Sequence, residues 1–189
     1  MISENFIYLA AAIAVLGSVS YFLDTLKGKT KPNRVTWLLW AIAPMIVFFS
    51  QLDVGVGMES IFTLAITLSP LMIFLASFWD KKAYWKLTKF DYICGILAAI
   101  GIILWQITDN ALYGLLFSLL ADLFAAVPTV RKSFTHPHTE NYHTFIAGSI
   151  SALITLLTLN SWDLFSAAFP IYIFGINTLI AFLILSRGR

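Results

Sequence analysis

Seven stretches of about twenty apolar residues follow one another along this chain of 189 residues, and they limit its possible folds more than any other feature. A helix needs about 20 apolar residues to cross a hydrocarbon core about 30 Å thick. The stretches do not alternate between apolar and polar residues, as the strands of a membrane barrel do. We therefore expect an all-α integral membrane protein with seven transmembrane helices. Their expected spans are about 5–25, 34–52, 59–79, 90–108, 111–131, 143–160 and 166–186.

The composition agrees with lipid as the solvent of this chain. Apolar residues make up 59% and charged residues 12%, whereas a soluble domain has about half and about a quarter. A soluble core of this size could not bury so much apolar surface. The first stretch follows Glu4 and has neither a basic leader nor a cleavage pattern, so we expect it to remain as the first helix.

The charged residues predict an orientation. Every Lys and Arg lies between stretches one and two, three and four, or five and six, or after stretch seven. The charged residues of the opposite loops are all acidic: Glu4, Asp53, Glu59, Asp109 and Asp163. The positive-inside rule then predicts a multi-pass protein of the cell (inner) membrane with its amino terminus outside and its carboxyl terminus cytoplasmic. The basic residues follow this topological pattern, so we expect no nucleic-acid partner.

An internal repeat predicts how the helices are grouped. A shift of about 108 positions aligns stretches one to three with five to seven and leaves the fourth unmatched. We expect one three-helix repeat at 1–86, a linker helix at 87–108 and a second repeat at 109–189. The linker adds one crossing, so the two three-helix bundles are parallel. Transporters with parallel repeats hold their substrate near mid-membrane, between the repeats.

One segment carries a resemblance to a known family. Residues 125–133 read Ala-Ala-Val-Pro-Thr-Val-Arg-Lys-Ser, and Thr-Glu-Asn follows at 139–141. This pattern resembles the PQ-loop signature, although Thr129 stands where that signature has glutamine and the first repeat has Ser20-Tyr21 at the matching pair. The order of three, one and three helices resembles SWEET sugar transporters and bacterial nicotinamide riboside transporters. The resemblance implies a seven-helix solute transporter that works by alternating access.

Two polar residues within apolar stretches are candidates for a solute site. Asp122 could accept a proton or a hydrogen bond from the solute, or it could tie its helix to a neighbour. Asn177 offers both donors and acceptors to a neutral ligand, or it could form an interhelical hydrogen bond. In SWEET-like transporters an asparagine of the seventh helix faces the central site, and Asn177 is similar in helix and depth. Ser69 is the repeat counterpart of Asn177, and Ser118 is expected on the same pathway.

Trp37 and Trp40 are three residues apart and share one helix face, which suits stacking on a sugar ring or a base. They could instead belong to an aromatic belt at the membrane surface, as we expect for Trp79 and Trp162.

Prolines and glycines within the stretches suggest hinges and close contacts. Pro44, Pro128 and Pro170 are candidate hinges, because proline removes a helical hydrogen bond. Prolines are also common in membrane helices without such a role. Gly148 and Gly175 are expected where helices approach closely.

Other classes of function lack the residues they need. No nucleotide-binding, nucleophile-elbow or zinc-protease motif is present, so we expect no enzyme activity, cofactor or metal. His136, His138, Glu140 and His143 do not follow a zinc spacing, and we expect a solvated loop there, with Thr139 or Asn141 capping the next helix. No Lys or Arg lies in the interior of a stretch, where it could neutralise an anion. The expected partner is thus a small neutral polar solute such as a sugar, nucleoside or vitamin-like compound, carried by a facilitator or a proton-coupled transporter. A seven-helix receptor or binding protein without transport is the alternative.

Overall fold

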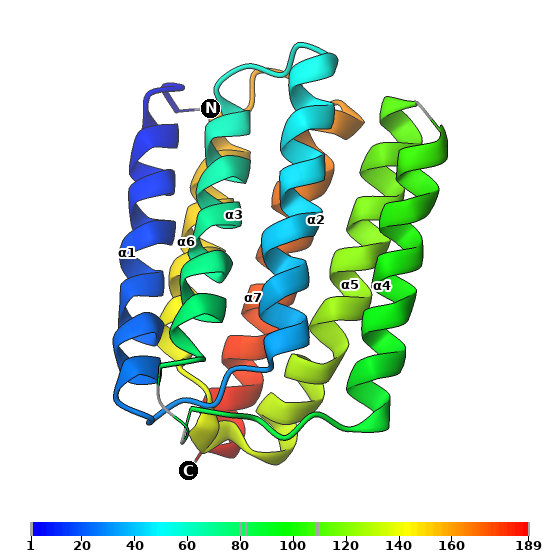
Figure 1. Ribbon diagram of the computed structural model, residues 1–189. Helices are drawn as coiled ribbons and strands as arrows, with labels where there is room; N and C mark the ends of the chain where they lie inside the picture. Colours follow the sequence, from blue (N-terminus) through cyan, green and yellow to red (C-terminus); the bar gives the residue numbers. More distant parts are fainter. Residues whose placement is uncertain (1, 80, 82, 109, 189) are drawn as a thin grey trace.

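A computed structural model describes residues 2–79, 81, 83–108 and 110–188. Within these residues the chain forms seven α-helices and one short 3-10 helix, and the α-helices run side by side along a common direction (Figure 1). Their bounds are α1 (Phe6–Leu26), α2 (Arg34–Asp53), α3 (Glu59–Ala76), α4 (Lys89–Thr108), α5 (Ala111–Thr135), η1 (Pro137–Thr139), α6 (Tyr142–Thr158) and α7 (Leu164–Arg187).

Helix length and hydropathy make this a multi-pass membrane protein. By these two criteria α1, α2, α3, α5 and α7 can each cross a membrane, and α6 is a shorter apolar helix of 17 residues. Large apolar side chains are exposed on the outer faces of the bundle, for example Leu16 at 69% and Phe182 at 64%. Such faces suit lipid, because soluble monomers rarely expose large contiguous apolar patches.

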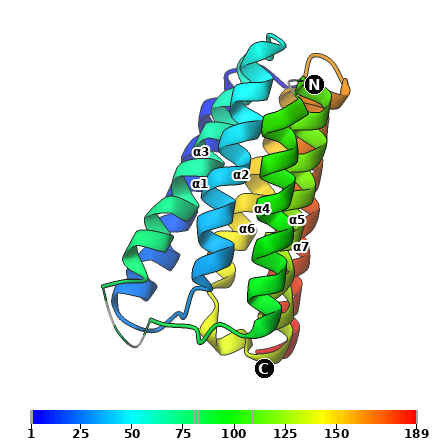
Figure 2. The same cartoon turned by 45° about the vertical axis from the view of Figure 1, so that its right-hand side comes forward.

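Six helices form a closed ring, and the seventh lies outside it. Around the ring each helix contacts the next in the order α1, α3, α2, α5, α7, α6 and back to α1. Helix α4 packs mainly on α5, on the side away from α1 (Figure 2). Helix α3 therefore lies between α1 and α2, and helix α7 lies between α5 and α6.

The two ends of the bundle differ in charge. Every described Lys and Arg lies at the end where α1 passes to α2, α3 to α4 and α5 to α6, and where α7 ends (Figure 1). We call this end the basic end. The chain begins at the opposite end, which agrees with an odd number of helices.

Two layers of buried side chains fill the ring. One layer, towards the basic end, has an aromatic centre and includes Tyr21, Trp37, Ile73, Ala125, Phe145 and Ile180. The other, towards the opposite end, has aliphatic side chains and phenylalanines and draws on every ring helix: Ile7, Val47, Phe62, Leu115, Ala152, Phe169 and Ile173. We call them the aromatic layer and the apolar layer.

Glycines allow α6 to approach both α1 and α7 closely. A Cβ at Gly17 would lie 2.1 Å from the Cβ of Ala147, so α1 and α6 are in backbone contact there. A Cβ at Gly148 would lie 2.7 Å from Oδ1 of Asn177 on α7. The expectation for Gly175 is wrong, because none of the described atoms outside its own helix backbone lies within 4 Å of a Cβ built there. Its side of α7 faces outward.

Helices α2, α5 and α7 continue through the candidate hinge prolines Pro44, Pro128 and Pro170. Helix α5 also runs past its expected end at 131 to Thr135, since Arg131 and Lys132 end the apolar run without ending the helix. The role of these prolines as hinges stays a prediction.

Candidate functional site

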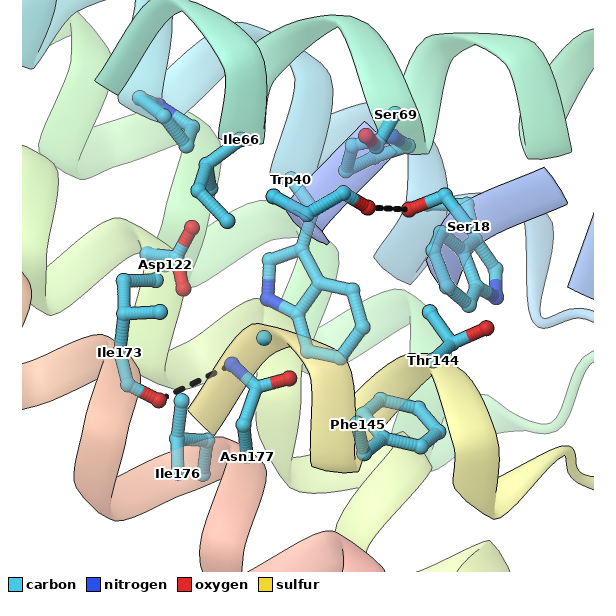
Figure 3. Close-up of a pocket in the computed structure, with 15 residues that line it drawn as sticks. Ser18, Trp40, Ile66, Ser69, Asp122, Thr144, Phe145, Ile173, Ile176 and Asn177 are labelled. Atoms are coloured by element: carbon cyan, nitrogen blue, oxygen red, sulfur yellow. Dashed lines mark hydrogen bonds between the residues drawn. The ribbon is translucent and has the colours of Figure 1, made fainter. Parts of the chain in front are cut away.

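A cavity of about 60 Å³ lies between the aromatic and apolar layers, lined by side chains from all six ring helices (Figure 3). Its floor is the aromatic layer, because Trp37 and Phe145 belong to both. This volume suits a few water molecules, whereas pockets for larger ligands measure about 300–1,000 Å³. A sugar or nucleoside would therefore need the helices to move apart.

Most of the site residues predicted from the sequence meet at this cavity. Asp122, Asn177, Trp40, Trp37 and Ser69 all line it, although they come from four different helices. Pro44 also lines it, while Pro128 and Pro170 do not. Ser118 is fully buried on α5, one turn from Asp122, but it lies outside the lining.

The two oxygens of Asp122 differ in their hydrogen bonds. The side chain is 2% exposed, and its Oδ2 accepts a hydrogen bond of 2.5 Å from the hydroxyl of Tyr172 on α7. Among the described residues, Oδ1 has no hydrogen bond of ordinary geometry. One oxygen therefore ties α5 to α7, as the structural interpretation of Asp122 expects, and a role of this residue in binding a proton or a solute stays a prediction. A buried carboxylate oxygen without a partner is costly, so a ligand that donates a hydrogen bond would be favoured there.

The two tryptophans form an aromatic wall beside Asp122. The rings of Trp37 and Trp40 meet edge to face at 5.2 Å, and Trp40 packs against Phe145 at 6.3 Å. Both are at most 8% exposed, so the interpretation of Trp37 and Trp40 as an interfacial belt is wrong. Neither indole nitrogen makes a hydrogen bond of ordinary geometry with a described residue, but that of Trp40 interacts with the Asp122 carboxylate, on whose side Figure 3 shows it. A donor and an acceptor thus stand close together.

Asn177 and the serines bond mainly to their own helices. The Asn177 amide donates to the carbonyl of Ile173 at 2.9 Å, which differs from the interhelical bond considered for it. Ser69 donates to Ala65 and Ser18 to Ala14 in the same way. Each of these side chains keeps an oxygen that can accept a further hydrogen bond. The cavity is therefore polar at several points of its wall.

A buried ionic network closes the bundle below the aromatic layer, at the basic end. Lys132 on α5 pairs with Glu140 at 2.7 Å, and the hydroxyl of Tyr21 on α1 donates to the other oxygen of Glu140 at 2.7 Å. Lys132 also donates to the carbonyl of Lys31. Thr139, Glu140 and Asn141 are buried, so the expected solvated loop is wrong for this segment. The network joins α1 and its following loop to the end of α5.

Asn141 joins the start of α6 to α1 beside this network. Its side-chain oxygen caps α6, as one of the two expected alternatives, and its amide donates to Asp24 at 2.6 Å and Ser20 at 2.9 Å on α1. Thr139 instead lies in η1. The histidines His136, His138 and His143 do not join Glu140 in a metal-binding group within the described part of the chain.

Sequence reasoning missed Tyr172, Ser18 and the buried network of Tyr21, Lys132 and Glu140. No sequence pattern marks Tyr172, because its hydrogen bond to Asp122 depends on which face of α7 lies against α5. The acidic Glu140 and basic Lys132 both looked like ordinary loop charges. Their pairing could not be read from a linear pattern.

None of the protein-family models, curated proteins or solved structures compared with this chain matches it.

Proposed function

We propose that the protein transports a small neutral polar solute, such as a sugar, nucleoside or vitamin-like compound, across the cell membrane. Seven membrane-spanning helices form two parallel three-helix repeats, α1–α3 within 1–86 and α5–α7 within 109–189. Helix α4, within 87–108, links them. The solute binds between the repeats and reaches each side of the membrane in turn.

The helix contacts support this division. If α1, α2 and α3 correspond to α5, α6 and α7, the contact of α1 with α6 corresponds to that of α5 with α2. The third helix of each trio also contacts both of the others. Asn33 and Asn141, which correspond under the shift of about 108, both cap the second helix of their trio with the side-chain oxygen. These relations are the ones expected of a twofold internal repeat, and they support the proposed division.

The observation that carries the proposal is the cavity at the junction of the repeats. It combines the Asp122 carboxylate, the indole N–H of Trp40 beside it and an aromatic wall, and Oδ1 of Asp122 has no hydrogen bond of ordinary geometry among the described residues. No Lys or Arg lines it among the described residues, so nothing there neutralises an anion. Hydrogen-bonding groups beside an aromatic face favour a neutral polar molecule with a planar or ring-shaped apolar part.

The layers around the cavity suggest how access alternates. The basic end is held by the ionic network across the repeats, and the opposite end by the apolar layer, where the ring of Phe62 on α3 lies 6.4 Å from that of Phe169 on α7. Opening one end therefore separates charged partners, and opening the other separates apolar side chains. Alternation requires that the two ends do not open together.

The orientation follows from the charges of the two ends. With the basic end cytoplasmic, the amino terminus lies outside and the carboxyl terminus inside. Tags on the two termini should report opposite sides of the membrane in a protease-protection assay. Protection of both tags on the same side would contradict the arrangement of seven spans.

Transport of radiolabelled solutes into liposomes that contain the purified protein tests the function. A panel of sugars, nucleosides and vitamin-like compounds should include one that enters by saturable uptake. Asp122→Asn should then weaken binding by about tenfold or more, because hydrogen bonds to charged groups contribute about 1.5–3 kcal/mol. Asp53→Asn, at the end of α2 outside the cavity, is the matched control. Saturable binding without uptake would instead identify a receptor.

The same substitution separates facilitation from proton coupling. If Asp122 carries protons, Asp122→Asn abolishes accumulation driven by a pH gradient but leaves exchange of labelled for unlabelled solute. If Asp122 only binds solute, both activities fall together. Unchanged affinity, exchange and pH dependence would remove Asp122 from the site and leave Asn177 as the main candidate.

A further inference from the structure

A second cavity lies at the basic end, outside the ring's interior. Its volume is about 390 Å³, and it is bounded by the start of α4, the segment before it and the last turns of α5. This volume is within the range of ligand pockets, about 300–1,000 Å³. The lining combines aromatic and basic side chains: Trp85, Phe90, Lys89, Arg131 and His136. We call it the basal crevice.

Two cations of the basal crevice, Lys89 and Arg131, have no acidic partner among the described residues. The described ion pairs join Lys132 to Glu140 and Lys29 to Asp24, and neither includes Lys89 or Arg131. Lys132 also lines the crevice, but Glu140 already compensates its charge. Among the described lining residues, the two positive charges of Lys89 and Arg131 exceed the single negative charge of Asp91, so the crevice keeps a net positive charge.

Asp91, the carboxylate among the described lining residues, accepts hydrogen bonds at both of its oxygens. It is 3% exposed, and its two oxygens accept hydrogen bonds from Asn33 at 2.7 Å and from the hydroxyl and amide of Thr88 at 2.7 and 2.5 Å. Asp91 is thus tied into the start of α4. It does not pair with Lys89 or Arg131.

The crevice also has an apolar side that continues into the bilayer. Arg131 lies over the ring of Phe90 at 5.1 Å. Ile93 and Leu97 follow Phe90 on the same face of α4, at spacings of three and four residues, and are 55% and 39% exposed. Cations at the helix ends next to an exposed apolar helix face match the two parts of a lipid, its headgroup and its acyl chains.

We propose that the basal crevice binds the headgroup of an anionic phospholipid, with the phosphate at Lys89 and Arg131 and an acyl chain along Phe90, Ile93 and Leu97 of α4. Guanidinium groups bind phosphate through paired hydrogen bonds. Basic pockets at the ends of membrane helices are suited to such headgroups. The site is separate from the central cavity, and it holds whether or not the protein transports a solute. Because Pro128 also lines the crevice, the bound lipid contacts α5 at its candidate hinge.

Lipid binding to the purified protein in neutral detergent tests the proposal. Phosphatidylglycerol and phosphatidylcholine with identical acyl chains are titrated, and the lipid bound is counted by native mass spectrometry. Phosphatidylglycerol should bind more tightly, and the double variant Lys89→Gln/Arg131→Gln should weaken it about fivefold for each cation removed. Phosphatidylcholine binding should change little.

A matched control removes the same charge from the same end of the bundle. Lys27 is exposed just after α1, and Arg187 on α7 lies over the ring of Phe134 at 4.1 Å, as Arg131 lies over Phe90. Lys27→Gln/Arg187→Gln should leave phosphatidylglycerol binding unchanged. Equal losses in the two double variants, or no preference for phosphatidylglycerol in the unsubstituted protein, would overturn the site.

Two further measurements complete the test. Inorganic phosphate should not displace phosphatidylglycerol, and full displacement at millimolar concentration would reassign the crevice to a soluble phosphate. Should the double variant fail to fold, photoreactive phosphatidylglycerol is cross-linked to the unsubstituted protein. Labels should concentrate in residues 85–97 and 128–136, and labels spread evenly over all helices would overturn the proposal.

Discussion

Asparagine and aspartate side chains begin four of the described helices. The side-chain oxygens of Asn33, Asn110, Asn141 and Asp163 each accept hydrogen bonds from two backbone N–H groups in the first turn of α2, α5, α6 and α7. Each such cap contributes about 1 kcal/mol to helix stability. The connections between these helices are short, so the caps also determine where each helix begins.

The cap of α7 leads to a prediction about pH. Hydrogen bonds to the Asp163 carboxylate, first from Ser161 and then from Ser166 and Phe165, lower its pKa to about 2. The unfolded chain has a pKa of about 3.9 there. Because the folded pKa is the lower one, Asp163 stabilises the fold above about pH 4, and this contribution is lost as the pH falls towards 2.

Asp163→Asn should keep the cap but remove this titration. The melting temperatures of the original protein and of Asp163→Asn, measured in detergent, should therefore converge or cross between pH 4 and pH 2. Asp163→Ala should melt lower than both at pH 7, because it lacks the cap. Identical pH profiles for the original protein and Asp163→Asn would contradict this reasoning.

The sequence was sufficient to choose five residues of the cavity lining, Asp122, Asn177, Trp40, Trp37 and Ser69, but not their partners. Asp122 and Asn177 are visible because a strongly polar side chain within an apolar run is costly and needs a reason. Ser118 was chosen on the same ground, yet it lies outside the cavity lining. Tyr172 could not be chosen, since its hydrogen bond to Asp122 depends on which faces of α5 and α7 meet.

At the scale of helices, the contact of α1 with α6 depends on Gly17. Gly17→Ala would place a methyl group against the Cβ of Ala147, 2.1 Å away, and neither atom can rotate aside. Overpacking of this kind costs about 1–3 kcal/mol. We expect a lower melting temperature for Gly17→Ala by fluorescence-detected size-exclusion chromatography. Gly175→Ala, which meets no described neighbour within 4 Å, should melt like the original protein. Equal melting of the two variants would mean that α1 and α6 can separate at little cost.

Pro128 lies inside helix α5 and is the candidate hinge closest to the basic end. Pro128 lies one turn before Lys132, so bending at Pro128 would move the ionic network of the basic end. Pro128→Ala restores a helical hydrogen-bond donor and should stiffen this turn. We expect slower solute exchange with an unchanged binding constant, measured on the same liposome preparation. An unchanged rate of exchange would rule out the hinge.

Helix positions followed closely from hydropathy, with two informative differences. Hydropathy marks where the apolar run ends, whereas a helix ends where its backbone hydrogen bonds end. Helix α5 therefore continues through Arg131 and Lys132 to Thr135. The segment after it was expected to be solvated, but Glu140 is buried because Lys132 and Tyr21 provide partners from other parts of the chain.

At the scale of the molecule, the spacing of the apolar stretches predicts a repeat and a linker helix, and this division stays a prediction. The closed ring could not be predicted, because spacing along the chain does not say which helices are neighbours. The ring makes the ionic network a contact between the two proposed repeats, with Tyr21 on one side and Lys132 on the other.

Glu140→Gln should therefore open the basic end. It removes the charge that compensates Lys132, and removing one partner of a buried ion pair costs about 3–5 kcal/mol. A cysteine at Ser18, which lines the central cavity, reports access in a Cys94→Ala background. A membrane-impermeant thiol reagent applied at the basic end should label Ser18→Cys several times faster when Glu140→Gln is also present.

Lys29→Gln is the control for this experiment, since it breaks the exposed ion pair of Lys29 with Asp24 at the same end. It should not change the labelling rate. If Glu140→Gln also leaves the rate unchanged, the network does not restrict access to the cavity.

The two buried layers predict that the protein in this form does not conduct ions. Phe62 and Phe169 in the apolar layer, and Tyr21 and Phe145 in the aromatic layer, are at most 1% exposed, so these described side chains admit no water at either level. An ion would have to shed its hydration to pass, at a cost far above the roughly 2.3 kcal/mol that 100 mV supplies per charge. A membrane that contains many copies of this protein would therefore keep its voltage, and any charge that moves through the protein would do so only together with a change in its shape.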